Sequence, residues 1–156
     1  MTEVFFNMTE EHRQLTDSQL TAFRSLLTSQ LLKLVDIFRR NNFEIRIVGG
    51  AVRDILTDKA PKDIDLATTA TPEQMMEMFD ACADCGVRTI IVSSEKHGTV
   101  TVRIDDTENY EVSTLRIDKN QDERQSGDVN SRNDWKWISD AGRRDLTVNS
   151  VFLGRK

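Results

Sequence analysis

The sequence predicts a mixed α/β (α+β) fold in which a sheet of about five strands is flanked by three or four helices. One observation is the stretch from Thr16 to about Arg40, where apolar residues recur every three or four positions, as in an amphipathic helix. A second is a set of short runs rich in β-branched residues, each bounded by glycine or polar turn residues. Strand-like and helix-like segments alternate along the chain, which favours a sheet with helices packed on it.

Length and composition limit the number of domains and the class of protein. The chain has 156 residues, of which 38% are hydrophobic and 30% charged, so residues 1–156 are expected to form one ordinary globular domain. This composition excludes collagen-like, low-complexity and wholly disordered chains. The net charge of -5 provides no general basic field, so any contact with nucleic acid has to be local.

The first elements follow in order. Residues 1–15 are expected to be a flexible N-terminus, and the helix from Thr16 to Arg40 should lay its apolar stripe on the sheet. Alternation from Phe43 to Val48 predicts a strand that ends at Gly49-Gly50. A short helix from about Ala51 to Leu56 should follow.

The central segment contains the remaining strands. Asp63 to Thr68 is the second predicted strand, and Thr71 is placed to cap a helix that begins with a proline and runs to about Ala83. Three more strands are expected, with the last two joined by a polar turn: Val87 to Val92, Thr99 to Ile104 and Glu108 to Leu115.

The C-terminal part is polar and then basic. Residues 116–133 contain almost no aliphatic side chains, which predicts a long mobile loop within the domain. Trp135 to Lys156 is expected to be helical again. Residues 132–156 contain three acidic residues and six basic ones: Arg132, Lys136, Arg143, Arg144, Arg155 and Lys156.

Location and redox state have weak signals. No apolar run approaches the about 20 residues that cross a bilayer, and the acidic start differs from a presequence. We therefore expect a cytoplasmic protein without membrane contact. For a longer form of the protein, a location in mitochondria or the nucleus is also open. Cys82 and Cys85 form a lone CxxC, which favours a reduced, incidental pair over a metal or redox site.

Asp63 and Asp65 form the most informative acidic pair. On a strand, residues two apart lie on the same face, so the two carboxylates should be close together. Two neighbouring anions repel unless a cation lies between them, and Mg²⁺ prefers carboxylate oxygens while keeping phosphate and water as further ligands. Glu111 would add a third carboxylate if its strand neighbours that of Asp63, although an exposed strand glutamate is an equal alternative on spacing alone.

The Gly49-Gly50 turn comes just before the acidic pair. Consecutive glycines let backbone N–H groups approach a phosphate, and Arg53 lies one turn into the following helix. Two glycines alone more often mark a plain turn, so the interpretation as a phosphate-binding turn depends on the combination with Asp63 and Asp65.

Several ordered motifs carry a family resemblance. The strings I-V-G-G-A-V-R-D-I-L, D-I-D-L-A-T-T-A-T-P, E-K-H-G-T-V-T-V-R, E-V-S-T-L-R-I-D and R-R-D-L-T-V-N-S span about Phe43 to Leu153. Together they closely resemble the class II CCA-adding tRNA nucleotidyltransferases, and the bacterial poly(A) polymerases share most of them.

The resemblance implies a polymerase-β-like nucleotidyltransferase head and a set of site residues. Asp63, Asp65 and Glu111 match the family's catalytic metal carboxylates, which hold Mg²⁺. The positions that match the nucleotide-binding motifs are Gly49, Gly50, Arg53, Arg143, Arg144, Asp145 and Asn149. The implied partners are CTP, ATP and the tRNA 3′ end, the last bound mainly by neck, body and tail domains that we expect to be absent here.

Three functions remain open at this stage. The first is a truncated head that transfers CMP and AMP to tRNA by two-metal catalysis and is impaired alone. The second is poly(A) polymerase-like adenylation of RNA 3′ ends, and the third is a non-catalytic isoform that binds nucleotide.

The loop segment Asp122 to Gly127 departs from the D-G-R-H-like family pattern. His97 is interpreted as a turn residue. The oligomeric state is not predicted.

Overall fold

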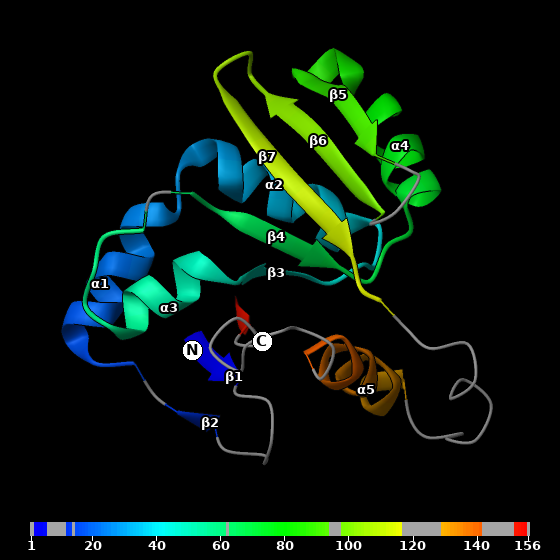
Figure 1. The fold of residues 1–156 in the computed structure, drawn as a ribbon. Helices are drawn as coiled ribbons and strands as arrows, with labels where there is room; N and C mark the ends of the chain where they lie inside the picture. The colour runs from blue at the N-terminus through cyan, green and yellow to red at the C-terminus, as the bar shows by residue number, and fades with distance from the viewer. Residues whose placement is uncertain are drawn as a thin grey trace.

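The computed structural model describes residues 2–5, 12–13, 15–61, 63–93, 98–116, 129–141 and 152–155. A mixed sheet runs through this part of the chain, in the order β2-β1-β8-β3-β4-β7-β6-β5 (Figure 1). The strands are β1 (Thr2–Phe5), β2 (His12–Arg13), β3 (Ile45–Val48), β4 (Asp65–Thr68), β5 (Val87–Ser93), β6 (Thr99–Ile104), β7 (Glu108–Thr114) and β8 (Phe152–Arg155). The described strands pair antiparallel except for β4 and β7, which are parallel.

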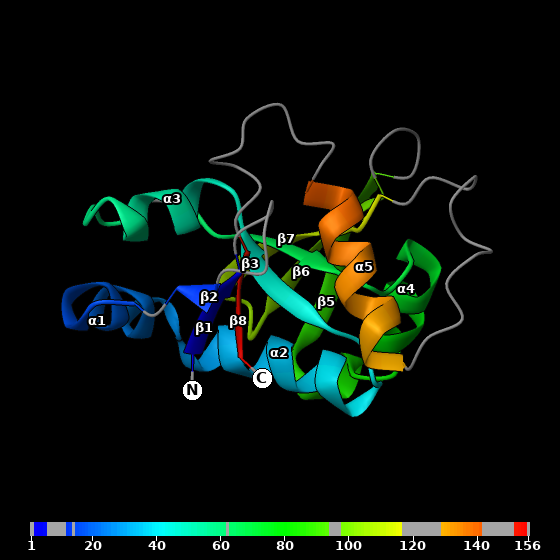
Figure 2. The same ribbon diagram turned by 90° about the horizontal axis from the view of Figure 1, so that it is seen from below.

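Five of these strands, β3 to β7, confirm the predicted mixed sheet. The other three were not predicted: β1 and β2 lie within the residues expected to be a flexible N-terminus, and β8 lies within the segment expected to be helical. Figure 2 shows β1 and β8 beside β3. These strands are short and depend on pairing between the two ends of the chain, which leaves little local signal.

The helices lie between and beyond the strands. They are α1 (Asp17–Leu26), α2 (Ser29–Arg40), α3 (Gly50–Leu56), α4 (Pro72–Asp80) and α5 (Val129–Ala141), with a 3₁₀ turn η1 (Ala83–Cys85) after α4. None of the described helices is long and apolar enough to cross a membrane.

The prediction of one helix from Thr16 to Arg40 is wrong, because the segment forms two. Thr28 adopts an extended backbone between them, with φ -63° and ψ 161°, and its hydroxyl accepts a hydrogen bond from the Leu31 N–H at 3.2 Å. A threonine in this role begins a new helix by satisfying a free backbone donor. The apolar spacing continues across the break, so periodicity alone does not reveal it.

The predicted start of α4 is confirmed. Thr71 and Gln74 form a reciprocal capping box, and Pro72 is the first helical residue. The helix ends at Asp80, earlier than predicted, and the remaining residues form η1.

The C-terminal helix also differs from the prediction. α5 spans Val129–Ala141 and so overlaps the segment expected to be a mobile loop, whereas Phe152–Arg155, expected to be helical, form the strand β8. The polar start of α5 has no apolar periodicity, which explains why its sequence resembles a loop. Residues 117–128 and 142–151 lie outside the described part of the chain.

The main core lies between one face of the sheet and helices α2, α3 and α4. Figure 1 shows α2 behind β4 and β7, with α4 beside β5 and β6. Phe38 of α2 and Phe79 of α4 are fully buried and meet edge to face, with ring centroids 5.8 Å apart. This geometry is favourable for aromatic pairs, so the two helices are held together beneath the sheet.

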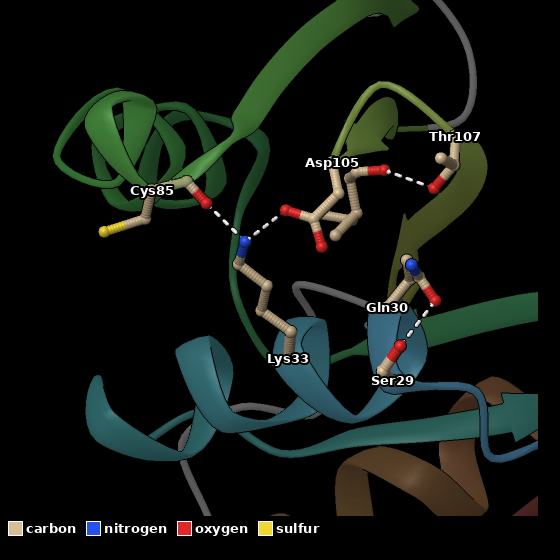
Figure 3. Close-up of polar contacts among 7 residues, drawn as sticks. Ser29, Gln30, Lys33, Cys85, Asp105 and Thr107 are labelled. Atoms are coloured by element: carbon tan, nitrogen blue, oxygen red, sulfur yellow. Dashed lines mark hydrogen bonds and ion pairs between the residues drawn. The ribbon is translucent and has the colours of Figure 1, made fainter.

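Lys33 ties α2 to two loops at one end of this core. Its ammonium group donates to the backbone carbonyl of Cys85 and forms an ion pair with Asp105, in the turn between β6 and β7 (Figure 3). The contact fixes the hairpin relative to the helix that supports it. Cys82 is half-buried and Cys85 is exposed.

The opposite face of the sheet is covered by α5. Trp137 and Ala141 pack on Val48, Ala67 and Leu115 to form a second, smaller core. The indole Nε1 of Trp137 donates to Glu44 Oε2 at 2.7 Å, and the Arg46 guanidinium lies 4.2 Å from the centre of the indole ring. These contacts place α5 over β3 and β4 on this face.

Candidate active site

Asp65 and Glu111 come together across the one parallel pair among the described strands. Asp65 is the first residue of β4, and its register partner on β7 is Glu111. Neighbouring strands are about 4.8 Å apart, so the two carboxylates project side by side from one face. Both are exposed, whereas the next pair, Leu66 and Val112, is buried in the main core. The alternation confirms that β7 neighbours β4.

Asp63 precedes the strand by two residues. The prediction placed it inside the strand, but β4 begins at Asp65. Ile64 between them packs against the main core while Asp63 is exposed, so the alternation of inward and outward residues begins before the ladder hydrogen bonds do. Asp63 therefore lies at the same end of the sheet as Asp65.

The Gly49 turn passes directly beside the Asp65 carboxylate. Val48 is the register partner of Asp65, so the chain leaves β3 next to this carboxylate. Gly49 has φ 69° and ψ -132°, a conformation that L side chains rarely adopt, and a Cβ built on it would lie 3.7 Å from Asp65 Oδ2. The glycine thus makes the turn between β3 and α3 possible at this point.

Arg53 lies in the middle of the short helix α3. Its Nε and Nη2 atoms donate to Asp54 Oδ1 at 3.1 and 3.0 Å, and a Cβ on Gly50 would lie 3.5 Å from Nη2. The guanidinium therefore folds back towards the glycine turn while paired with Asp54. It is about half exposed, so a phosphate can reach it from solvent.

The described carboxylates do not form a closed metal cage. Among the side chains that the structure describes, no group of three His, Cys, Asp or Glu residues lies close enough to hold an ion. The carboxylate groups of Asp65 and Glu111 also make no hydrogen bond or ion pair with any described residue. Their donor chemistry nevertheless fits a hard divalent ion: both groups offer oxygen ligands, are exposed and have no competing partner.

Four predicted nucleotide-binding residues lie outside the described residues: Arg143, Arg144, Asp145 and Asn149. His97 and the Asp122 to Gly127 segment are outside them as well.

Sequence reasoning missed a further row of polar residues on the site face. Asn109 on β7 pairs with Arg103 on β6, and Arg103 pairs with Arg88 on β5. The alternating string Thr-Val-Thr-Val-Arg-Ile over β6 is the signal that places Arg103 opposite the core face.

The mixed sheet and its flanking helices match the fold that the resemblance to nucleotidyltransferases led us to expect. The described fold is accordingly that of a nucleotidyltransferase head. Residues 45–156 match the family described as "Poly A polymerase head domain", and the chain belongs to this family.

Individual relatives agree with this assignment. The chain is 53% identical over 132 residues to the mitochondrial CCA tRNA nucleotidyltransferase 1 of Danio rerio. This match covers 85% of the chain and 29% of the relative. It is 36% identical over 128 residues to the CCA-adding enzyme of Geobacillus kaustophilus, covering 81% and 29%. The chain thus spans less than a third of the length of these relatives.

A solved structure shows the same fold. The CCA-adding enzyme of Bacillus stearothermophilus in complex with CTP superimposes with a TM-score of 0.57 and 29% sequence identity. The match covers 79% of this chain and 26% of that protein.

Proposed function

We propose that this chain is the head of a CCA-adding tRNA nucleotidyltransferase, which transfers CMP and AMP from CTP and ATP to the 3′ end of tRNA. Family membership and the relatives' names support the reaction class. The observation that carries the proposal is the placement of Asp65 opposite Glu111 with the Gly49 turn against Asp65. This brings a carboxylate pair and a glycine turn to one end of the sheet.

Asp63, Asp65 and Glu111 are the proposed ligands for Mg²⁺. When bound, the divalent ions would lower the pKa of the RNA 3′-hydroxyl and neutralise charge on the pyrophosphate leaving group. A bound cation would offset the mutual repulsion of these neighbouring carboxylates. The pairing of β4 with β7 would hold the ligands at fixed spacing and so contribute positioning as well as charge.

The triphosphate is proposed to lie along the turn between β3 and α3. Backbone N–H groups of Gly49 and Gly50 would donate to phosphate oxygens. Arg53 would exchange its contact with Asp54 for a forked contact with phosphate. By the family resemblance, Arg143, Arg144, Asp145 and Asn149 would contact the nucleotide and its ribose.

Addition to a truncated tRNA tests this function. The chain is incubated with Mg²⁺ and tRNA that lacks its terminal CCA, and labelled CTP and ATP are supplied separately and together. CMP incorporation from CTP, followed by AMP only when ATP is added, is the expected result. No incorporation by the folded chain would contradict the proposal that these 156 residues carry the activity.

The family description favours one second function. "Poly A polymerase head domain" raises adenylation of RNA 3′ ends, which would use the same carboxylates. Incorporation with ATP alone, and none with CTP, would select this alternative.

The location in the cell is also proposed from the relatives. The Danio rerio relative is mitochondrial by name, so we propose mitochondria for a longer form, alongside the cytoplasm expected from the acidic start of the sequence. Neck, body and tail regions of such a form would supply the main grip on tRNA. Fractionation of cells that express the full-length protein would decide between the compartments.

A further inference from the structure

The face that carries Asp65 and Glu111 continues across β6 and β5. Glu111 is paired with Thr101, and one step towards the hairpin turn Asn109 is paired with Arg103. Register partners on neighbouring strands project to the same side of a sheet. Val102 and Ile104, which alternate with these residues on β6, are fully buried in the main core. Arg103 therefore lies on the same face as the carboxylates.

Arg88 extends this row to the edge of the sheet. It is the register partner of Arg103 on β5, so two arginines lie side by side across the strands. Like charges in this position destabilise a sheet, and none of the carboxylates that the structure describes is paired with Arg103. Its Nε donates to Asn109 Oδ1 at 2.9 Å, and its other N–H groups have no partner among the described residues. Such an arrangement is suited to an anionic ligand.

The side chain of Arg88 is held by a different residue. Its guanidinium forms an ion pair with Asp106 in the hairpin turn, and the two side chains are 61% and 76% exposed. An ion pair this exposed is worth little, so a phosphate can displace Asp106 without much loss. Of the described helices, α5 is the one that packs on this face, and the second core joins it to Val48 of β3, Ala67 of β4 and Leu115 just after β7.

The chemistry of phosphoryl transfer indicates from which side the RNA approaches the row formed by Asn109, Arg103 and Arg88. The attacking hydroxyl and the departing pyrophosphate lie in line on opposite sides of the α-phosphorus. With the triphosphate at the Gly49 turn beyond β4, the RNA 3′ end has to approach from the side of β7. The RNA nucleotides that precede this 3′ end then cross β6 and β5. From strand spacing and rise, Arg103 lies about 8 Å from Glu111 and Arg88 one strand further out.

We propose that Arg103 and Arg88 bind the phosphodiester backbone of the last nucleotides of the RNA strand whose 3′ end is extended. The inference rests on the proposed function, since the direction of approach follows from where the triphosphate lies. Arginine suits this task because its fork of donors matches phosphate oxygens. The site is local and basic within an acidic chain, and Asp106 competes with the RNA for Arg88.

Binding of a short 5′-fluorescein-labelled single-stranded RNA, followed by anisotropy, tests the proposal. Arg88→Gln combined with Arg103→Gln should weaken RNA binding about tenfold or more, because charged hydrogen bonds are lost. The slope of binding against salt should fall by about 0.7 for each phosphate contact removed. Arg103→Lys should recover part of the affinity. Asp106→Asn should tighten RNA binding, and asparagine tolerates the positive φ of 56° at this position.

Two controls separate this site from the nucleotide site. Arg40→Gln removes an equally charged side chain from the end of α2, where it pairs with Asp36, and should leave RNA binding unchanged. CTP binding in the presence of Mg²⁺ should be the same in the double variant as in the parent chain. Unchanged RNA affinity in the double variant, or absence of RNA binding by the parent chain, would overturn the inference while CTP binding stands. Failure of the parent chain to bind CTP with Mg²⁺ would instead overturn the proposed function.

Discussion

Asp65 and Glu111 lie directly opposite each other on β4 and β7, although α4, β5 and β6 lie between them in the sequence. The following residues, Leu66 and Val112, are paired in the same register and fully buried. A slip of one residue would turn both apolar side chains to solvent and both carboxylates into the core. The hydrophobic core therefore fixes the position of the acidic pair.

Neutralising Asp65 should remove activity and leave stability intact. We expect Asp65→Asn to lower nucleotide incorporation by about 100-fold or more, the scale of loss for a group that stabilises charge in the transition state. The melting temperature should stay the same or rise, since the substitution relieves repulsion with Glu111. Incorporation assays and thermal unfolding provide the two measurements.

Glu77→Gln is the matched control for this substitution. Glu77 is exposed on α4, which packs on the other face of the sheet, so its loss should change neither activity nor stability. A folded Asp65→Asn chain with parental incorporation would remove Asp65 from the catalytic site.

The two glycines of the turn should respond differently to alanine. Gly49→Ala forces a side chain into a conformation with φ 69°, which should lower the free energy of unfolding by about 1–3 kcal/mol. Gly50→Ala lies in the first helical position with only an ordinary contact to Arg53 and should change stability by less than about 0.5 kcal/mol. Urea unfolding compares the two, and equal effects would contradict the conformational argument.

Tyr110 should titrate well above the ordinary range. Burial, with help from the hydrogen bond to Glu108, raises the pKa of Tyr110 from 10.0 to about 12. In the unfolded chain the phenol loses its proton near pH 10, so between pH 10 and 12 the unfolded state binds fewer protons than the folded one. Stability that is fully present below pH 10 is then lost as the pH rises towards 12.

The chain contains one tyrosine, so absorbance at the tyrosinate band reports this group alone. Tyr110→Phe should abolish the signal and the associated loss of stability. A midpoint near pH 10 in chain that circular dichroism shows to be folded would contradict the buried, hydrogen-bonded position.

Trp137 should hold α5 on the sheet. Trp137→Phe keeps an aromatic ring over Val48 and Ala67 but removes the hydrogen bond to Glu44, which should cost about 1–2 kcal/mol. Hydrogen exchange in α5 should accelerate more than in β4. Trp135→Phe, at a half-buried position of the same helix, should have a smaller effect; the reverse order would be inconsistent with the second core.

The sequence was sufficient for the central strands. It identified Asp63 and Asp65 as neighbouring candidates, although Asp63 lies just before β4, and it left the pairing of Asp65 with Glu111 open. Alternation of apolar and polar residues is a local signal, and it placed β6 and β7 within a residue of their observed limits. Likewise, Thr71 and Pro72 identify the start of α4 because capping depends on side chains within one turn.

Elements that depend on distant pairing could not be predicted in this way. β1 and β8 are formed by contact between the two ends of the chain, and neither has an alternating pattern of useful length. The row from Asn109 through Arg103 to Arg88 likewise appears only when the register of three strands is known. The break at Thr28 was missed for another reason: the apolar repeat continues through it.

A crystal structure of the chain grown with Mn²⁺ and CTP tests the central claim most directly. The account predicts an anomalous peak between the carboxylates of Asp65 and Glu111, with Asp63 drawn towards it and the triphosphate against Gly49 and Gly50. Manganese bound elsewhere, or a triphosphate away from the turn between β3 and α3, would contradict it.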